Sequence, residues 1–222
     1  MPQDNGEPPH AARLREGLLL ALQAADQAAA HGIVERAAGL GWSPDELRCE
    51  LITPVLYEVG SRWEHGEIGV AEEHLATSIC EWLLFTISGR TPRAVGPHDR
   101  RAVVGCSAGE LHTLGALIVA NVLTERGWRV LNLGASTPPD AWAPIVRARR
   151  VDVAVLSTTT PSAIAQVPDT LRSIRDARSD CLTVVGGQAY VSRAIGRRVG
   201  ATIVGADPRD LPDQLDAALA TS

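Results

Sequence analysis

The sequence predicts an α/β protein in two parts, a four-helix bundle in residues 1–88 and a five-stranded parallel sheet in residues 101–222. The first part has helical periodicity and Ala/Leu-rich segments throughout. The second alternates short β-branched runs with helical stretches of about a dozen residues. Residues 89–100, with two Gly and two Pro and no periodicity, are expected to be a linker.

Glycine, proline and capping residues set the expected helix ends of the bundle. Ser43 before Pro44 and two acidic residues is a helix start, since Ser caps the free N–H groups and the acids face the positive end of the dipole. Gly32 is expected to separate the first two helices, and Pro54 to kink the third. The expected antiparallel helices cover residues 10–32, 33–40, 43–63 and 70–87.

Strand–helix alternation in the second part predicts a sheet covered on both faces by helices. Five strands in about 120 residues suit a flavodoxin-like, or Rossmann-like, domain with strand order 2-1-3-4-5. The expected strands are the runs AVVGCS, WRVLNLG, VDVAVLSTT, CLTVVGG and ATIVGA.

Composition and charge restrict the function. With 45% apolar and 21% charged residues, the 222-residue chain is typical of soluble globular proteins, and it lacks an apolar run long enough to span a membrane. Four widely spaced cysteines predict the reduced thiols of a cytoplasmic protein. A net charge of −5 argues against direct nucleic-acid binding. Residues 1–89 carry 5 Arg and 14 Asp or Glu, and residues 90–222 carry 16 Arg and 12 Asp or Glu. Two parts of opposite charge could attract each other within one chain or between the chains of a homo-oligomer, and two solvated surfaces explain the pattern equally well.

Small and polar residues follow the first, third and fourth strands, at the edge where open parallel sheets bind ligands. His112, two residues after Glu110, suits a metal-ligating imidazole held by a carboxylate, although a surface loop histidine has the same pattern. Together the three loops resemble the cobalamin-binding signature of corrinoid proteins, with gaps of 41 and 26 residues between their motifs. The matching residues are Glu110, His112, Gly115, Ser157, Thr159, Gly186 and Gly187.

The resemblance implies that His112 binds cobalt from below in a base-off cobalamin, within a loop where Leu111 and Thr113 also contact the cofactor. Gly115, Ser157, Thr159, Gly186 and Gly187 would then make room for the nucleotide tail or hydrogen-bond it. The chain departs mildly from this signature at two positions. Glu110 stands where the family frequently has Asp, and Thr159 stands where it frequently has Leu.

Trp63, followed after nine residues by Glu73 and His74, resembles the helical cap of CarH/LitR-type light sensors that use adenosylcobalamin. The resemblance implies that Trp63 and Val70 cover the upper ligand and that Glu73 and His74 lie beside it. An alternative is that Trp63 is a core aromatic of the bundle and that Glu73 and His74 form a solvated helix face.

Two departures concern the response to light. The family carries a histidine directly after the Trp that ligates cobalt after photolysis, whereas this chain has Glu64 there and His65 one position later. The ligand after light, His65, His74 or water, is therefore left open. The family also carries a helix-turn-helix domain before the bundle, so the output here is expected to pass through another protein or an oligomeric change.

The resulting expectation is a cobalamin-binding light sensor that is not an enzyme. A corrinoid methyl carrier of a methyltransferase system, for which methylcobalamin would be the cofactor form, shares the same layout and is the main alternative. A detached mutase subunit and a nucleotide- or flavin-binding sheet are the remaining readings.

Overall fold

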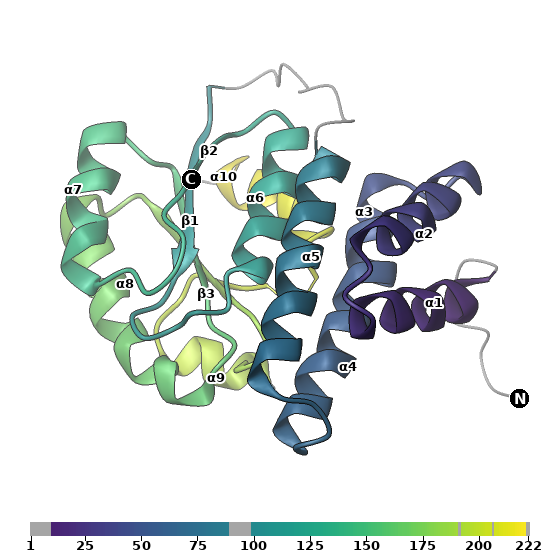
Figure 1. Cartoon of the computed structure of the whole chain (residues 1–222). Helices are drawn as coiled ribbons and strands as arrows, with labels where there is room; N and C mark the ends of the chain where they lie inside the picture. The colour runs from purple at the N-terminus through teal and green to yellow at the C-terminus, as the bar shows by residue number, and fades with distance from the viewer. Residues whose placement is uncertain (1–9, 89–98, 191, 206, 221–222) are drawn as a thin grey trace, which may run out of the picture. The chain divides into compact units, whose positions relative to one another are not determined.

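The computed structural model describes residues 10–88, 99–190, 192–205 and 207–220. It consists of two compact units, Met1–Thr91 and Pro92–Ser222, whose elements are labelled in Figure 1. Most of the predicted linker, residues 89–98, lies outside the described residues. Within the described part, none of the helices combines the length and apolar character that crossing a membrane requires.

The first unit is helical, as the sequence predicts. Its core is made of fully buried aliphatic side chains, among them Leu18, Val34, Leu51 and Leu83. A π-helical turn, Leu47–Ile52, joins the third and fourth helices into one continuous segment. The helices are α1 (Ala11–Gln23), α2 (Gln27–Gly39), α3 (Pro44–Glu46), α4 (Thr53–Glu64) and α5 (Val70–Ser88).

The expected helix break at Gly32 is wrong, because the break lies at residues 24–26 and Gly32 sits inside α2. Asp26 is the N-cap of α2, and its carboxylate accepts a hydrogen bond from the Ala29 N–H at 2.8 Å. Ala25 adopts a left-handed backbone with φ of 51°. One cap satisfies an otherwise free N–H, whereas an interior glycine costs only about 1 kcal/mol, so the cap decides where the helix begins.

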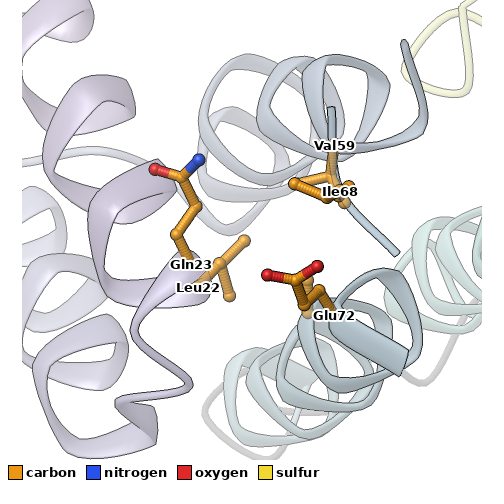
Figure 2. A pocket seen from close by; sticks show the side chains of 6 residues that line it. Leu22, Gln23, Val59, Ile68 and Glu72 are labelled. Atoms are coloured by element: carbon orange, nitrogen blue, oxygen red, sulfur yellow. The ribbon is translucent and has the colours of Figure 1, made fainter. Parts of the chain in front are cut away.

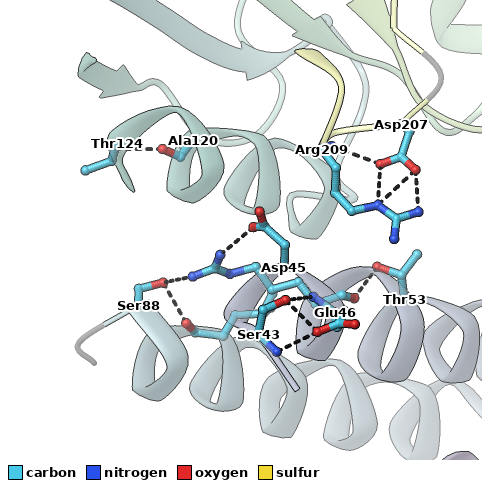
Figure 3. Close-up of polar contacts among 11 residues, drawn as sticks. Ser43, Asp45, Glu46, Thr53, Ser88, Ala120, Thr124, Asp207 and Arg209 are labelled. Carbon is cyan, nitrogen blue, oxygen red and sulfur yellow. Dashed lines mark hydrogen bonds and ion pairs between the residues drawn. The ribbon is translucent and has the colours of Figure 1, made fainter. Parts of the chain in front are cut away.

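The predicted helix start at Ser43 is confirmed and forms a full capping box. The Ser43 hydroxyl accepts from the Glu46 N–H at 3.2 Å, and the Glu46 carboxylate accepts from the Ser43 N–H at 2.7 Å (Figure 3). The kink expected at Pro54 stays a prediction, and the structure has a π-helical turn, Leu47–Ile52, just before this residue. There the Thr53 N–H donates to the Arg48 carbonyl five residues earlier, and the Thr53 hydroxyl donates to the same oxygen at 2.8 Å.

Arg48 is a fully buried cation of the bundle. Its guanidinium donates to Asp45 at 3.2 Å and to the Ser88 hydroxyl at 3.5 Å, contacts that Figure 3 shows at Asp45 and Ser88. A buried charge is stable only when it is paired and hydrogen-bonded. Through its hydrogen bond to Ser88, Arg48 therefore stabilises the carboxyl end of α5, the helix that carries Glu73 and His74.

The second unit confirms the predicted flavodoxin-like sheet. Its five strands are parallel in the order β2-β1-β3-β4-β5. The register aligns Cys106 with Ser157 and Ser157 with Gly186, so three strands end side by side. The elements are β1 (Arg101–Cys106), α6 (Leu114–Glu125), β2 (Arg129–Asn132), α7 (Pro139–Arg149), β3 (Val153–Ser157), a 3-10 turn (Pro161–Gln166), α8 (Val167–Ala177), β4 (Leu182–Gly186), α9 (Arg193–Arg198), β5 (Ile203–Val204) and α10 (Leu211–Ala220).

Alternating strand residues build a core on each face of this sheet. On one face, Val104 and Val155 pack with Leu123 of α6 and Leu215 of α10. On the other, the neighbouring strand residues pack against α7 and α8, where Trp142 is fully buried. Because both faces are covered, ligand chemistry is confined to the edge where the strands end.

Three buried thiols are expected to be chemically inert in the folded chain. Burial raises the pKa of Cys80 and Cys181 to about 12 and that of Cys106 to about 11. At pH 8 a maleimide should modify the partly exposed Cys49 first and reach these three only on unfolding. The folded pKa values lie above the unfolded value of about 8.5. The thiols therefore make their full contribution to the stability of the folded state below that pH, and this contribution decreases as the pH rises towards 11 to 12. Mass spectrometry of the labelled protein checks the order, and rapid labelling of Cys106 in native buffer would contradict it.

Candidate functional site

Backbone hydrogen bonds join the three loops at the carboxyl edge of the sheet. The Ser107 N–H after β1 donates to the Ser157 carbonyl at 3.1 Å, and the Thr158 N–H after β3 donates to the Gly186 carbonyl at 2.9 Å. The motifs that are far apart in sequence therefore meet at one edge, as predicted.

Glu110 is the centre of this edge, with no exposed surface. One carboxylate oxygen accepts from the His112 N–H at 2.9 Å and from the His112 ring Nδ1 at 2.5 Å. The other oxygen accepts from the backbone N–H groups of Thr159 and Thr160, at 2.7 and 2.6 Å. One side chain thus positions the histidine and also binds the loop after β3.

The environment of Glu110 keeps it ionised. Burial alone would raise the pKa of this carboxyl, but the hydrogen bonds from the His112 and Thr160 N–H groups, the His112 ring and the Thr159 N–H together lower it. An ionised carboxylate only accepts hydrogen bonds, so the proton in the contact with His112 is on Nδ1.

His112 is thereby held through Nδ1, and within the described residues its Nε2 has no hydrogen bond. The side chain is 57% exposed, and Nδ1 is occupied by a buried anion. Metal-ligating histidines usually donate their second ring N–H to a carboxylate, which fixes the tautomer and makes the ligating nitrogen more basic. The residues therefore fit a metal that needs one axial imidazole, as the cobalt of a corrinoid does. His112 would hold this metal, and Glu110 would orient His112.

The residues expected around the nucleotide tail lie against one another in the structure. A Cβ on Gly115 would be 3.1 Å from the Ser157 hydroxyl, and one on Gly187 would be 2.3 Å from the Thr158 carbonyl oxygen. Thr159 contributes its N–H to Glu110. Leu111, in the histidine loop, is 72% exposed. The contacts of these residues, and of Thr113 and Gly186, with a cofactor tail remain predictions.

Replacing Gly187 by Ala is expected to lower the free energy of unfolding by about 2–4 kcal/mol, since strain at φ of 109° adds to a clash with backbone atoms. Gly109→Ala is the matched control, because Gly109 has φ of 80° and open space around it, which limits the cost to about 1 kcal/mol. Urea unfolding followed by circular dichroism measures both. If both variants lose the same free energy of unfolding, the close approach of Gly187 to the Thr158 carbonyl does not affect stability.

In the bundle, Glu73 and His74 form a second carboxylate–imidazole pair. The His74 ring Nδ1 lies 2.6 Å from Glu73 Oε2, and the Thr77 hydroxyl donates to Glu73 Oε1 at 2.8 Å. The Glu73 side chain is 19% exposed and that of His74 is 73% exposed. Trp63 and Val70 are 45% and 55% exposed, so Trp63 is not a core aromatic.

His65, the other candidate ligand, ends α4. Its ring Nδ1 lies 2.7 Å from the Ser61 carbonyl oxygen, one turn earlier. The same carbonyl also accepts the backbone N–H of His65 at 3.0 Å, so the ring is held against the last turn of α4.

Sequence reasoning missed three contributors. The Thr160 N–H binds Glu110, and no side-chain pattern marks a backbone donor. Tyr190 lies 3.4 Å from the hydroxyl of Thr158, which contacts Ser107 at 3.0 Å. The Thr77 contact with Glu73 was accessible, because residues four apart meet on a helix face.

A small cavity lies inside the bundle, between α1, α4 and α5 (Figure 2). Its volume is about 50 Å³, which suits a few waters and is far below a cofactor's size. The Glu72 carboxylate at its rim accepts from the Gly69 N–H at 2.6 Å and so has a capping role. The lining residues are Leu22, Gln23, Val59, Ile68, Glu72 and Ala76.

The fold and the histidine loop define a corrinoid-binding class of protein, and the comparisons with known proteins agree. A family model described as a B12 binding domain matches residues 100–211, and a second model with that description matches residues 14–84. The chain belongs to the B12 binding domain family.

Two curated relatives and one solved structure show the range of similar proteins. The HTH-type transcriptional repressor CarH of Myxococcus xanthus is 35% identical over 82% of this chain and 60% of its own length. Trimethylamine corrinoid protein 1 of Methanosarcina acetivorans is 26% identical over 87% of this chain and 91% of its own. The monomethylamine corrinoid protein of Methanosarcina barkeri shares the fold, with a TM-score of 0.78 over 95% of this chain and 99% of that one, at 15% identity. The chain therefore spans about 60% of the repressor's length.

Proposed function

We propose that this protein is a cobalamin-binding light sensor that uses adenosylcobalamin and is not itself an enzyme. The observation that carries the proposal is the pair Glu73–His74, which nine residues separate from Trp63 and in which the His74 side chain is exposed. The 35% identity to a CarH repressor supports the same assignment. When bound, adenosylcobalamin supplies a cobalt–carbon bond that light breaks.

The chain's own residues have separate tasks in this proposal. His112 supplies the lower axial nitrogen, and Glu110 keeps its tautomer fixed. The indole of Trp63 and the small side chain of Val70 exclude water from the upper ligand. Glu73, already fixed by Thr77, accepts hydrogen bonds from the polar groups of that ligand.

The output is proposed to be a change in oligomeric state or in the binding of a separate regulatory protein, in a cytoplasmic setting. A light-induced change in a packed helical unit is a two-state event of the kind that such outputs need.

A corrinoid methyl carrier is the second candidate. The observation in its favour is the match to trimethylamine corrinoid protein 1, which extends over 91% of that protein. A methyl carrier would bind methylcobalamin at least as tightly as adenosylcobalamin, whereas the proposed sensor prefers the adenosyl form because Trp63 and Glu73 contact the larger ligand.

The test is to bind adenosylcobalamin to the protein in the dark and to record its absorption spectrum and gel-filtration volume before and after green light. The sensor predicts a change in both, and Trp63→Ala should weaken the preference for adenosylcobalamin over methylcobalamin. Equal affinity for the two forms, with no change in elution volume on illumination, would reject the sensor and favour the carrier.

A further inference from the structure

Helix α5 is packed unequally along its length. Four side chains of its carboxyl half have no exposed surface, namely Cys80, Leu83, Leu84 and Ile87. In its amino half, Val70 and Leu75 are 55% and 52% exposed, and the first buried residue is Ala76. Segments with few buried apolar contacts open at a lower cost than the core does. The two halves of α5 are therefore expected to differ in local stability.

The cavity of the bundle lies beneath this amino half (Figure 2). Glu72 and Ala76, one helical turn apart on α5, line it together with Leu22 of α1 and Val59 of α4. Leu22, Val59 and Ala76 are each at most 3% exposed, so this part of the lining belongs to the core. Unfilled volume removes the dispersion contacts that facing side chains would otherwise make. The amino half of α5 is thus held less tightly against α1 and α4 than a filled core would hold it.

The amino end of α5 begins with half of a capping box. The N–H of Gly69, the residue before the helix, donates to the Glu72 carboxylate at 2.6 Å. At α3 the equivalent contact is completed by the Ser43 hydroxyl, which accepts from the Glu46 N–H. Glycine has no side chain that could accept such a hydrogen bond, so one contact fewer fixes the first turn of α5.

The carboxyl end of α5 is anchored by a buried charge. The Arg48 guanidinium, which has no exposed surface, donates to the Ser88 hydroxyl at 3.5 Å and to Asp45 at 3.2 Å. The Ser88 hydroxyl donates in turn to the Leu84 carbonyl at 2.9 Å. Separating this end would take a partner from a buried cation, which is costly. An opening of α5 therefore starts at its amino end.

We infer that α5 is a two-part helix, in which residues 70–77 separate together from α1 and α4 while residues 79–88 stay packed. The bundle then exchanges between a closed and an open form, and the cavity lowers the free-energy difference between them. This inference goes beyond the proposed function, because it describes the chain without any cofactor. Val70, Glu73 and His74 all lie on the part that moves. A ligand that contacts Glu73 in the closed form would hold α5 closed, a step that rests on the proposed function.

The first experiment measures amide hydrogen exchange of the full chain without cofactor, by NMR. After correction for intrinsic rates, the amides of residues 74–77 should exchange at least about 100-fold faster than those of residues 80–87, because the latter exchange only when the bundle unfolds. The amides of residues 74–77 should also share one opening constant, since they open as a unit. Ordinary fraying of a helix end gives instead rates that fall steadily from residue 74 to residue 77.

The second experiment fills the cavity in the same protein. Val59→Ile adds one methyl group from α4 and should slow exchange at residues 74–77 by about fourfold, because a buried carbon that gains contacts stabilises the closed form. Ala76→Leu adds three carbons from α5 itself and should slow it by about tenfold or more. The matched control is Val55→Ile, since Val55 is also 3% exposed on α4 but does not line the cavity, and it should not slow these amides.

Two results would overturn the inference. If residues 74–77 exchange as slowly as residues 80–87, α5 opens only with the whole bundle. If their rates are graded and Val59→Ile changes them no more than Val55→Ile does, the end of the helix only frays and the cavity plays no part. Both experiments use the protein without cofactor, so a failure to bind cobalamin or to respond to light would reject the proposed function and leave this inference standing.

Discussion

Glu110→Gln is expected to lower the free energy of unfolding by about 2–4 kcal/mol, as large a loss as Gly187→Ala causes at the same edge of the sheet. Glu110 has no exposed surface, and its two oxygens accept four hydrogen bonds. A glutamine offers one acceptor oxygen, so its amide N–H₂ must face either the His112 donors or the N–H groups of Thr159 and Thr160. Buried donors that lose their acceptor carry the full desolvation penalty.

The same substitution should weaken cobalamin binding by about 10–100-fold, because His112 loses the anion that fixes its tautomer. Urea unfolding gives the stability and spectroscopic titration gives the affinity. Asp176→Asn is the matched control, since it also converts a carboxylate to an amide, but at an exposed position, and it should change stability by less than about 0.5 kcal/mol. Equal effects of the two variants would show that the buried hydrogen bonds do not carry the site.

Glu110→Asp separates the two tasks of the carboxylate. The side chain is shorter by one methylene, so it can keep the contacts with His112 only by withdrawing from Thr159 and Thr160. We expect cobalamin affinity close to that of the wild type together with a stability loss about half that of Glu110→Gln. A weakened affinity with intact stability would reverse this assignment.

His112→Ala is expected to have the largest effect on cofactor binding. Losing a residue that supports a metal ligand typically lowers affinity by about 10–100-fold. Removing the ligand itself should therefore lower the affinity for cobalamin by at least about 100-fold. The variant should fold normally, because the side chain is 57% exposed and its removal leaves Glu110 with three of its four donors.

Spectroscopic titration with cobalamin in the dark measures this effect, and added imidazole should restore part of the wild-type spectrum. Wild-type affinity in His112→Ala would remove His112 from the site and with it the proposed lower ligation. Retained binding with an altered spectrum would instead locate most of the affinity in the nucleotide tail.

Much of the fold could be predicted from the sequence because its signals are local. β-branched runs bounded by glycine mark the strands, and their alternation with helices predicts a parallel sheet covered on both faces. The capping box at Ser43 is equally local. The first helix break could not be placed, because alanines surround Asp26 and the more conspicuous glycine, Gly32, lies in the helix interior.

The candidate site was predictable in its side chains but not in its backbone contacts. The spacing of Glu110 and His112 predicts their hydrogen bond, and the aligned strand ends predict that the loops meet. The sequence carries no sign that the second oxygen of Glu110 binds the N–H groups after β3, because every residue except proline has that donor. The pairing of Glu73 with His74 was hidden for another reason, since adjacent helical residues ordinarily diverge.

Because Glu110 accepts hydrogen bonds from backbone N–H groups after β3, most side-chain substitutions there differ in effect from substitution by proline. Within the described residues, the loop after β3 binds Glu110 through the amide hydrogens of Thr159 and Thr160, so side-chain replacements at these positions leave both hydrogen bonds intact, whereas proline removes one. The side chains of Thr159 and Thr160 can therefore vary between related sequences without changing how Glu110 holds the His112 ring.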